Sequence, residues 1–298
     1  MTARWRRRDV VLLGALAVGG CAAPRTAPGA SRASAGPPSV TPTPSPSPTP
    51  TPRTSPSSRR SPTPGAGPTR ADLVAEFAGQ SPTSFGLEVP GIRTRTRDGE
   101  VALTLDACGG PGGGSGVDHD LLDLLRRHEV PATLFLNVRW IDANPAVAQE
   151  LAADPLFELA NHGKRHCPLT VRPRTAYGIR GTGSVGEVVD EVRAADDWFL
   201  EHVGERPRWF RSGTAHADDV AARVAERLGQ PLAGFTVNAD LGATASASQV
   251  ARTLGGVGSG DIVIAHMNRP GGATAEGFAR ALPRLLRAKT SFVTLTNS

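Results

Sequence analysis

Short apolar runs that alternate with helical patterns are the feature that most constrains the fold of this chain. Seven runs rich in apolar and β-branched residues occupy positions 101–105, 132–137, 157–160, 208–210, 232–237, 262–265 and 292–295. Six segments with helical periodicity separate them, at 118–128, 145–153, 185–202, 218–228, 246–254 and 274–287. Strands that alternate with helices pair in parallel. We therefore expect residues 99–298 to form one α/β domain, a distorted barrel of the (β/α)7 type.

The first 21 residues have the composition of an export signal. A basic cluster at positions 4–8 precedes an apolar run at 10–18, which is too short for a permanent membrane span. Residues 18–21 resemble a bacterial lipobox, in which the cysteine becomes the lipidated first residue. Ordinary cleavage near Ala22 is the alternative, and Arg7-Arg8 also suits twin-arginine export. We expect lipidation of Cys21 and a membrane anchor on the outer face of the cell membrane.

Residues 22–70 consist almost entirely of Pro, Ser, Thr, Ala and Gly, with some Arg. Such a segment cannot bury enough apolar surface to offset its chain entropy, so we expect a disordered tether. At about 3 Å per residue it would reach on the order of 150 Å, into the cell wall. Residues 71–98 form a lead-in segment before the α/β domain.

The net charge of +5 belongs to the N-terminal part of the chain. Residues 1–70 hold ten Arg and one acidic residue, which leaves 23 basic and 27 acidic residues after position 70. The folded part is thus mildly acidic, whereas a nucleic-acid-binding domain would carry a basic excess. We expect no nucleic-acid partner, and we expect a monomer.

Polar residues suited to chemistry follow five of the expected strands. They are Asp106, the pair His162 and His166, Arg211, Asp240 and His266. The carboxyl ends of parallel barrel strands meet at one face of the domain, where barrel enzymes gather their active sites. The sequence therefore predicts a single site built from these side chains.

These residues resemble the five motifs of the polysaccharide deacetylase family, the NodB-like carbohydrate esterases, in the order of the family. The segments are Thr-Leu-Asp-Ala-Cys at 104–108, Asn-His-Gly-Lys-Arg-His at 161–166, Arg-Ser-Gly-Thr at 211–214, Asn-Ala-Asp at 238–240 and Ile-Ala-His at 264–266. The resemblance covers roughly residue 101 to the C-terminus. It implies the NodB fold and the removal of acetyl groups from a polysaccharide.

The resemblance also implies roles for single residues. Asp106 would be the general base and His266 the general acid. A carboxylate at a strand end can pair with Arg211, and Asp240 can orient His266.

The same resemblance implies a divalent metal, zinc or similar, on His162 and His166. The family's first motif normally has two adjacent Asp, and Ala107 stands where the second, a metal ligand, is expected. The third ligand is then Asp106, an acid from residues 118–120, or water. On this interpretation, Asp restored at position 107 should raise the affinity for metal.

Two cysteines, Cys108 and Cys167, lie next to the proposed site residues. An even pair in an exported domain favours a disulfide, which we expect here. A cysteine metal ligand and two free thiols are the alternatives. The glycine-rich segment 109–116 lacks the Lys-Ser/Thr ending of a phosphate-binding loop, so we expect a flexible active-site loop.

Taken together, the sequence favours a deacetylase of a cell-wall or chitin-like polysaccharide. One alternative keeps the barrel but hydrolyses an amide of a small molecule without metal. Another, which the Ala107 substitution supports, is a catalytically inactive glycan-binding module.

Overall fold

The computed structural model describes residues 67–97 and 99–298. The expected export signal, the lipidation site Cys21 and the tether up to residue 66 lie outside the described residues. No helix of the described part has both the length and the apolar character that a membrane span requires.

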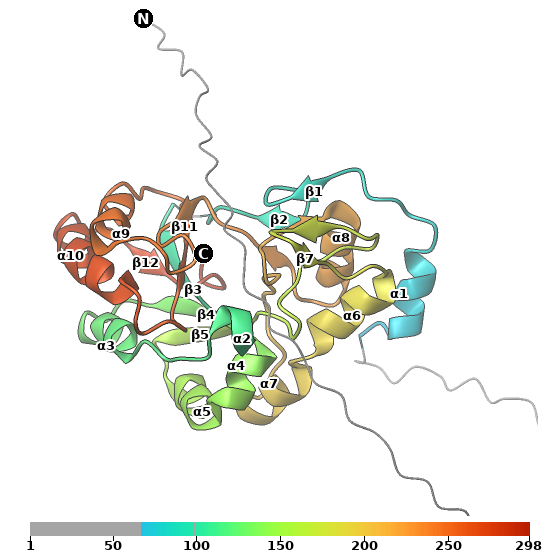
Figure 1. Ribbon diagram of the computed structural model, residues 1–298, viewed down its shortest axis with the longest axis horizontal. Helices are drawn as coiled ribbons and strands as arrows, with labels where there is room; N and C mark the ends of the chain where they lie inside the picture. Colours follow the sequence, from blue (N-terminus) through green and yellow to red (C-terminus); the bar gives the residue numbers. More distant parts are fainter. Residues whose placement is uncertain (1–66, 98) are drawn as a thin grey trace, which may run out of the picture. The chain divides into compact units, whose positions relative to one another are not determined.

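A parallel sheet forms the centre of the domain (Figure 1). Its strands follow the order β10-β11-β3-β4-β5, and β12 also pairs with β3. Their bounds are β3 Val101–Ala107, β4 Ala132–Leu136, β5 Phe157–Asn161, β10 Val237–Asn238, β11 Ile262–His266 and β12 Phe292–Val293. All of these pairings are parallel, so the carboxyl ends of the strands share one edge.

The sheet curves onward beyond β5 through single bridges. Asn161 bridges Phe210, and Phe210 bridges Leu232 of β9 (Leu232–Ala233), which pairs with β2 (Ile92–Arg93). Among the described residues no pairing joins β9 or β2 to β10. The α/β fold with a parallel sheet is confirmed, and the barrel is not closed.

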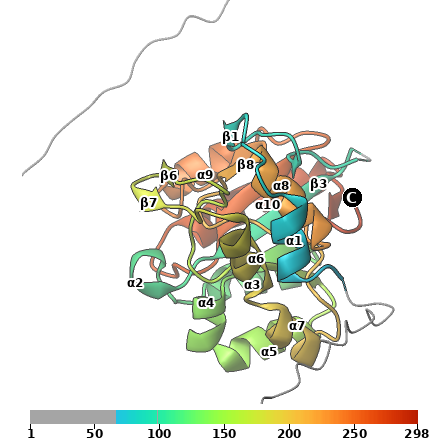
Figure 2. The ribbon, with the colours of Figure 1, turned by 90° about the vertical axis from the view of Figure 1, so that its right-hand side faces the viewer.

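Helices cover the outside of the sheet (Figures 1 and 2). Their bounds are α1 Arg70–Glu76, α2 Gly110–Gly113, α3 His119–Arg127, α4 Val138–Ala143, α5 Pro145–Ala153, α6 Val185–Arg193, α7 Asp196–His202, α8 Asp219–Arg227, α9 Ala247–Leu254 and α10 Thr274–Arg287. Polar side chains cap several N-termini; Asp118, for example, accepts the N–H of Leu121 at 3.1 Å. Two small antiparallel pairs complete the fold: β1 Phe85–Gly86 with β8 Ala217–Asp218, and β6 Thr175–Ala176 with β7 Ile179–Arg180.

One expected helix, at 185–202, is divided into α6 and α7. Asp196, the first residue of α7, is buried and accepts hydrogen bonds from Gln230 at 2.9 Å and Arg206 at 3.0 Å. The hydrogen bonds to Asp196 thus lie at the point where the chain is divided into α6 and α7.

Alternation along β3 sorts its side chains onto two sides. Residues 101, 103, 105 and 107 belong to the apolar cluster shared with α3, α9 and α10. Thr104 and Asp106 point the other way, where both accept hydrogen bonds from Arg211. Because β3 extends through Ala107, Cys108 follows on the same side as Asp106.

The lead-in segment is part of the folded domain. Leu73 of α1 and Phe77 after it are buried in a second apolar cluster with Val188 and Val192 of α6. Further along, Asp219 of α8 accepts the backbone N–H of Thr83 at 2.8 Å. The domain therefore includes these residues before β3.

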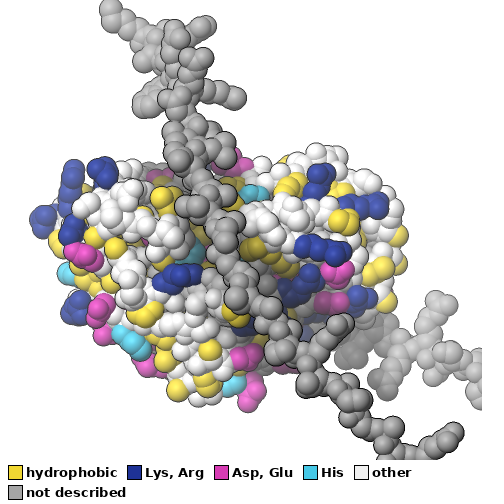
Figure 3. Space-filling model, in the orientation of Figure 1, with side chains coloured by type: hydrophobic (Ala, Val, Ile, Leu, Met, Phe, Trp, Pro, Cys, Tyr) yellow, Lys and Arg dark blue, Asp and Glu magenta, His cyan; other side chains and the backbone are white. Residues whose placement is uncertain are grey.

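Charged side chains of both signs are interspersed on the face shown in Figure 3. Several Arg form ion pairs at the surface, such as Arg165 with Glu187 at 2.9 Å and Arg70 with Asp190 at 2.8 Å. Such a mixed surface agrees with the mild net charge of this part of the chain.

Candidate active site

A buried ion pair joins β3 to the segment after Phe210. Arg211 is fully buried and donates from Nη1 to Asp106 Oδ1 at 2.7 Å and to Thr104 Oγ1 at 2.8 Å. Its other donors reach the carbonyls of Ala233 and Gly234. Burial alone would raise the pKa of Asp106, but the charges around it, Arg211 first, lower that pKa below its usual value. The carboxyl group is therefore held ionised.

A second acid–base pair lies on the neighbouring strand. His266 ends β11 directly beside Asp106 in the parallel register. Its Nδ1 lies 2.9 Å from Asp240 Oδ1, while Asp240 Oδ2 accepts the backbone N–H of His266 and the hydroxyl of Thr274. Burial would lower the pKa of His266, but hydrogen bonds to Asp240 and Cys108 raise it well above its usual value. Asp240 thus fixes the ring and favours its protonated form.

His162 follows β5 and is almost fully buried. Its Nδ1 lies 2.9 Å from the carbonyl oxygen of Arg211, which can only accept, so Nδ1 carries the hydrogen. The other nitrogen, Nε2, lies 3.6 Å from Asp106 Oδ2 and 3.7 Å from Cys108 Sγ. His162 is therefore oriented with Nε2 toward the site.

The segment from His162 to His166 is a loop and not a helical turn. Gly163 and His166 both have positive φ, +69° and +57°. Glu191 of α6 lies behind the loop and accepts the backbone N–H groups of Lys164 and Arg165 at 3.0 and 2.9 Å. Sequence reasoning missed Glu191, although its three-residue spacing from Val188 places it on the apolar face of this helix, which was a visible signal.

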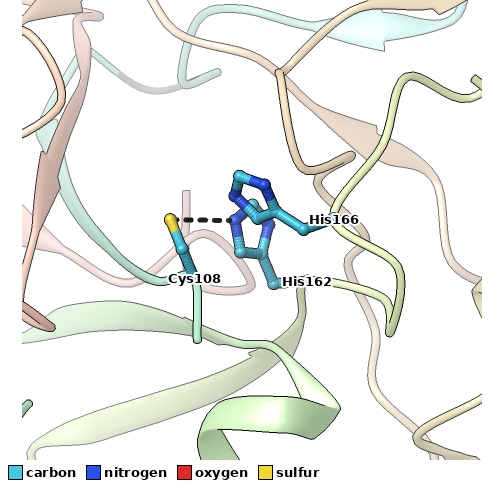
Figure 4. A group of neighbouring side chains, drawn as sticks. All are labelled: Cys108, His162 and His166. Carbon is cyan, nitrogen blue, oxygen red and sulfur yellow. Dashed lines mark hydrogen bonds between the residues drawn. The ribbon is translucent and has the colours of Figure 1, made fainter. Parts of the chain in front are cut away.

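Cys108 Sγ, His162 and His166 converge (Figure 4). One ligand atom from each lies within 4.8 Å of the other two. Burial raises the pKa of the Cys108 thiol, but hydrogen bonds to His162, His166 and His266 together lower it well below its usual value. The thiol is thus the third donor of this cluster.

The predicted disulfide between Cys108 and Cys167 is wrong, because both cysteines are free. Cys108 faces the two imidazoles instead. Cys167 is buried near Glu191, and burial together with that carboxylate raises its pKa to about 12. The two thiols therefore occupy different environments.

Ala107, taken from the motif as the vacant ligand position, does not face the site. It is fully buried in the apolar cluster on the opposite side of β3. Nor do the acids of residues 118–120 join the three converging donors. Asp118 instead caps α3. The idea that Asp at 107 would restore a ligand is therefore corrected: position 108 is the one that faces the histidines.

A cavity of about 400 Å³ opens over these groups. Asp106, His166 and His266 line it, together with Tyr177 and Leu241 at the rim. Tyr177 is 78% exposed at the tip of the β6–β7 hairpin. Sequence reasoning missed this hairpin, although Tyr-Gly, here both with positive φ, suits a tight turn.

The donors fit a divalent metal. Two imidazoles and a thiol are the donor types that zinc and similar ions take in proteins. His166 Nε2 is buried and has no hydrogen-bond partner among the described residues. A buried polar atom without a partner is costly unless a ligand satisfies it.

The domain is thus an open parallel α/β barrel with two anchored carboxylate pairs and a set of converging metal-type donors at its strand ends. The family model of polysaccharide deacetylases matches residues 93–233. This part of the chain is therefore similar to polysaccharide deacetylases.

Solved structures share the fold. A family 4 carbohydrate esterase described as a pseudoenzyme, from Bacillus anthracis, superposes with a TM-score of 0.58 at 20% identity, covering 70% of this chain and 69% of that one. A peptidoglycan N-acetylglucosamine deacetylase gives 0.57 at 21% identity, covering 68% and 90%. At these identities the likeness concerns the fold alone.

A curated relative, the uncharacterized protein YlxY of Bacillus subtilis strain 168, is 24% identical over 168 residues. The matched part is 55% of this chain and 47% of YlxY. The chain thus spans about half the length of that relative.

Proposed function

We propose that this chain removes acetyl groups from a cell-wall or chitin-like polysaccharide, with N-acetylglucosamine units as targets. The observation that carries the proposal is the pair of anchored groups at one cavity. Asp106 is fixed by Arg211, and His266 is fixed by Asp240. Amide hydrolysis needs a base for water and an acid for the departing amine, and these two groups suit those tasks.

The residues act as follows in this proposal. Asp106 accepts the proton of the attacking water through Oδ2, because Arg211 occupies Oδ1. His266 donates a proton from Nε2 to the leaving nitrogen, because its Nδ1 is bound to Asp240. A metal held by His162 and His166, when bound, would polarise the acetyl carbonyl and lower the pKa of the water. Asp240 offsets the charge of protonated His266.

The rim of the cavity supports a sugar substrate. Tyr177, Ile179 and Leu241 are exposed apolar side chains beside the catalytic groups. An aromatic ring with one exposed face can pack against the apolar face of a sugar ring while its hydroxyl stays in water. This exposed rim favours a polymer over a small amide.

We further propose that the protein is a lipoprotein anchored through Cys21 on the outer face of the cell membrane. The support is the order of a basic cluster, an apolar run and Gly-Gly-Cys in the sequence. Cells grown with a labelled fatty acid should yield a labelled parent protein and an unlabelled Cys21→Ala variant. A labelled variant would contradict the anchor.

The activity is tested by acetate release from a chitooligosaccharide. The parent should release acetate, and Asp106→Asn should lose at least about 100-fold of the rate because the base is removed. Asp120→Asn, an exposed carboxylate on α3, is the matched control and should keep full activity. Full activity in Asp106→Asn would refute the proposal.

Two other outcomes have defined meanings. A parent that binds the oligosaccharide without releasing acetate would be a glycan-binding module. A parent that hydrolyses only small acetamides, and does so after metal removal, would be a small-molecule amidase.

A further inference from the structure

We propose that Cys108 is the third protein ligand of a metal site with His162 and His166, and that its sulfur makes the site prefer Zn²⁺ or Co²⁺ over Mn²⁺ or Mg²⁺. The motif resemblance assigns no role to this cysteine. The inference rests on the proposed function for the task of the metal, but metal binding itself can be measured without turnover.

The separation of the donors suits one bound ion. Zinc bonds of about 2.3 Å to sulfur and about 2.05 Å to nitrogen, at a tetrahedral angle, put the two ligand atoms about 3.6 Å apart. Cys108 Sγ lies 3.7 Å from His162 Nε2. His166 offers a donor within 4.8 Å of both atoms. An ion can therefore bind with small movements of the side chains.

The donors are also held in place from behind. The carbonyl of Arg211 accepts from His162 Nδ1, a partner that fixes the ligating tautomer of a metal-bound histidine. Glu191 anchors the loop before His166 through two backbone N–H groups. Cys108 lies one residue beyond a central strand of the sheet. Such support is typical of a preorganised site.

The carboxylate at the site is already engaged. Asp106 Oδ1 accepts from Arg211 at 2.7 Å, and its charge is balanced within a buried ion pair. Within residues 67–97 and 99–298, Cys108, His162 and His166 are the one group of three such side chains with converging ligand atoms. The sulfur, and not a second carboxylate, completes the set of three.

Ligand chemistry then determines the preferred metal. Thiolate is a soft ligand and imidazole an intermediate one, a combination that favours Zn²⁺ and Co²⁺. Mn²⁺ and Mg²⁺ favour carboxylate, carbonyl and water oxygens. A carboxylate at position 108 should therefore shift the preference toward Mn²⁺.

The test is a Co²⁺ titration of the full chain after removal of metal by a chelator. A cobalt–thiolate bond produces a near-ultraviolet charge-transfer absorption that imidazole and carboxylate ligands do not produce. The parent should show this band at one equivalent of Co²⁺, and Zn²⁺ should displace it. Cys108→Ala should lose the band and at least about 10-fold in affinity, since loss of an outer partner alone costs that much.

Three variants serve as comparisons. Cys108→Asp should bind metal without the band and with a higher affinity for Mn²⁺ relative to Zn²⁺ than the parent. Cys167→Ala and Cys21→Ser remove the other two thiols and should keep the band. Circular dichroism should show that each variant is folded before it is titrated.

The outcomes separate the two proposals. A band and an affinity that survive in Cys108→Ala would overturn the ligand assignment, whether or not acetate is released. A parent with the band that binds metal but releases no acetate would overturn the proposed function and leave the ligand assignment intact.

Discussion

A carboxylate introduced at position 107 should destabilise the fold instead of creating a metal ligand. Ala107 has no exposed surface and lies in the apolar cluster between β3 and the helices. A carboxyl group there has no partner, so it must remain protonated at neutral pH. For the group to be neutral at pH 7, burial must raise its pKa by about three units, and the loss of the favourable ionisation costs about 4 kcal/mol. Ala107→Asp should therefore lower the free energy of unfolding by about that amount.

The measurement is urea denaturation followed by circular dichroism at pH 7, with metal affinity measured on the same samples. Ala107→Val separates the effect of volume, because overpacking alone costs about 1–3 kcal/mol. Cys108→Asp puts the same carboxylate one residue later, where it faces His162 and His166. This variant should lose less than about 2 kcal/mol, as for most single substitutions.

The refuting result is specific. If Ala107→Asp keeps the stability of the parent and binds metal more tightly, the side chain at 107 faces the site. The alternation along β3 described above would then be wrong.

Two further predictions concern single backbone contacts. Gly213→Ala should weaken metal binding and lower the free energy of unfolding by about 1–3 kcal/mol, because the added Cβ would overlap the backbone carbonyl carbon of His166. Gly271→Ala is the control, since a Cβ there meets no atom within 4 Å. Equal behaviour of the two variants would contradict the tight contact. Asp219 accepts the N–H groups of Thr83 and the next residue, and these bonds, against the effect of burial, lower its pKa. Because the folded pKa lies below the unfolded one, this stabilisation is present above about pH 4 and is lost as the pH falls through the lowered value. Asp219→Asn keeps one oxygen for these bonds but does not titrate, so its unfolding free energy should fall less between pH 5 and 3 than that of the parent; equal slopes would rule out this linkage.

Much of the fold was visible in the sequence because its elements are strongly periodic. The helices at 145–153 and 274–287 have the bounds that the pattern predicted. The run at 232–237 was expected as one strand but is divided into β9 and β10. Gly234 lies between them, donates its N–H to the carbonyl of Arg93 and accepts from Arg211. A tertiary contact of this kind leaves no local signal in the sequence.

The site was predictable in its members but not in its geometry. Strand ends of one polarity brought Asp106, His162 and His266 together, as the topology required. The side on which each side chain emerges depends on where the strand ends, and β3 extends two residues beyond the predicted Leu105. The motif position therefore suggested Ala107 as the metal-ligand position. The alternation of side chains along β3 instead directs Ala107 into the core and Cys108 toward the histidines.

The two-residue spacing between Asp106 and Cys108 separates two roles that the sequence analysis had both offered to Asp106, metal ligand and general base. If Asp106 had to replace a missing ligand, it could not act freely as a base. With Cys108 as the proposed ligand on the same side of the strand, Asp106 keeps its ion pair with Arg211 and leaves Oδ2 for the proton of water. The two tasks then belong to two side chains whose positions one strand fixes together. A substitution at 108 should change the metal while the base stays in place, whereas a substitution at 107 changes the core.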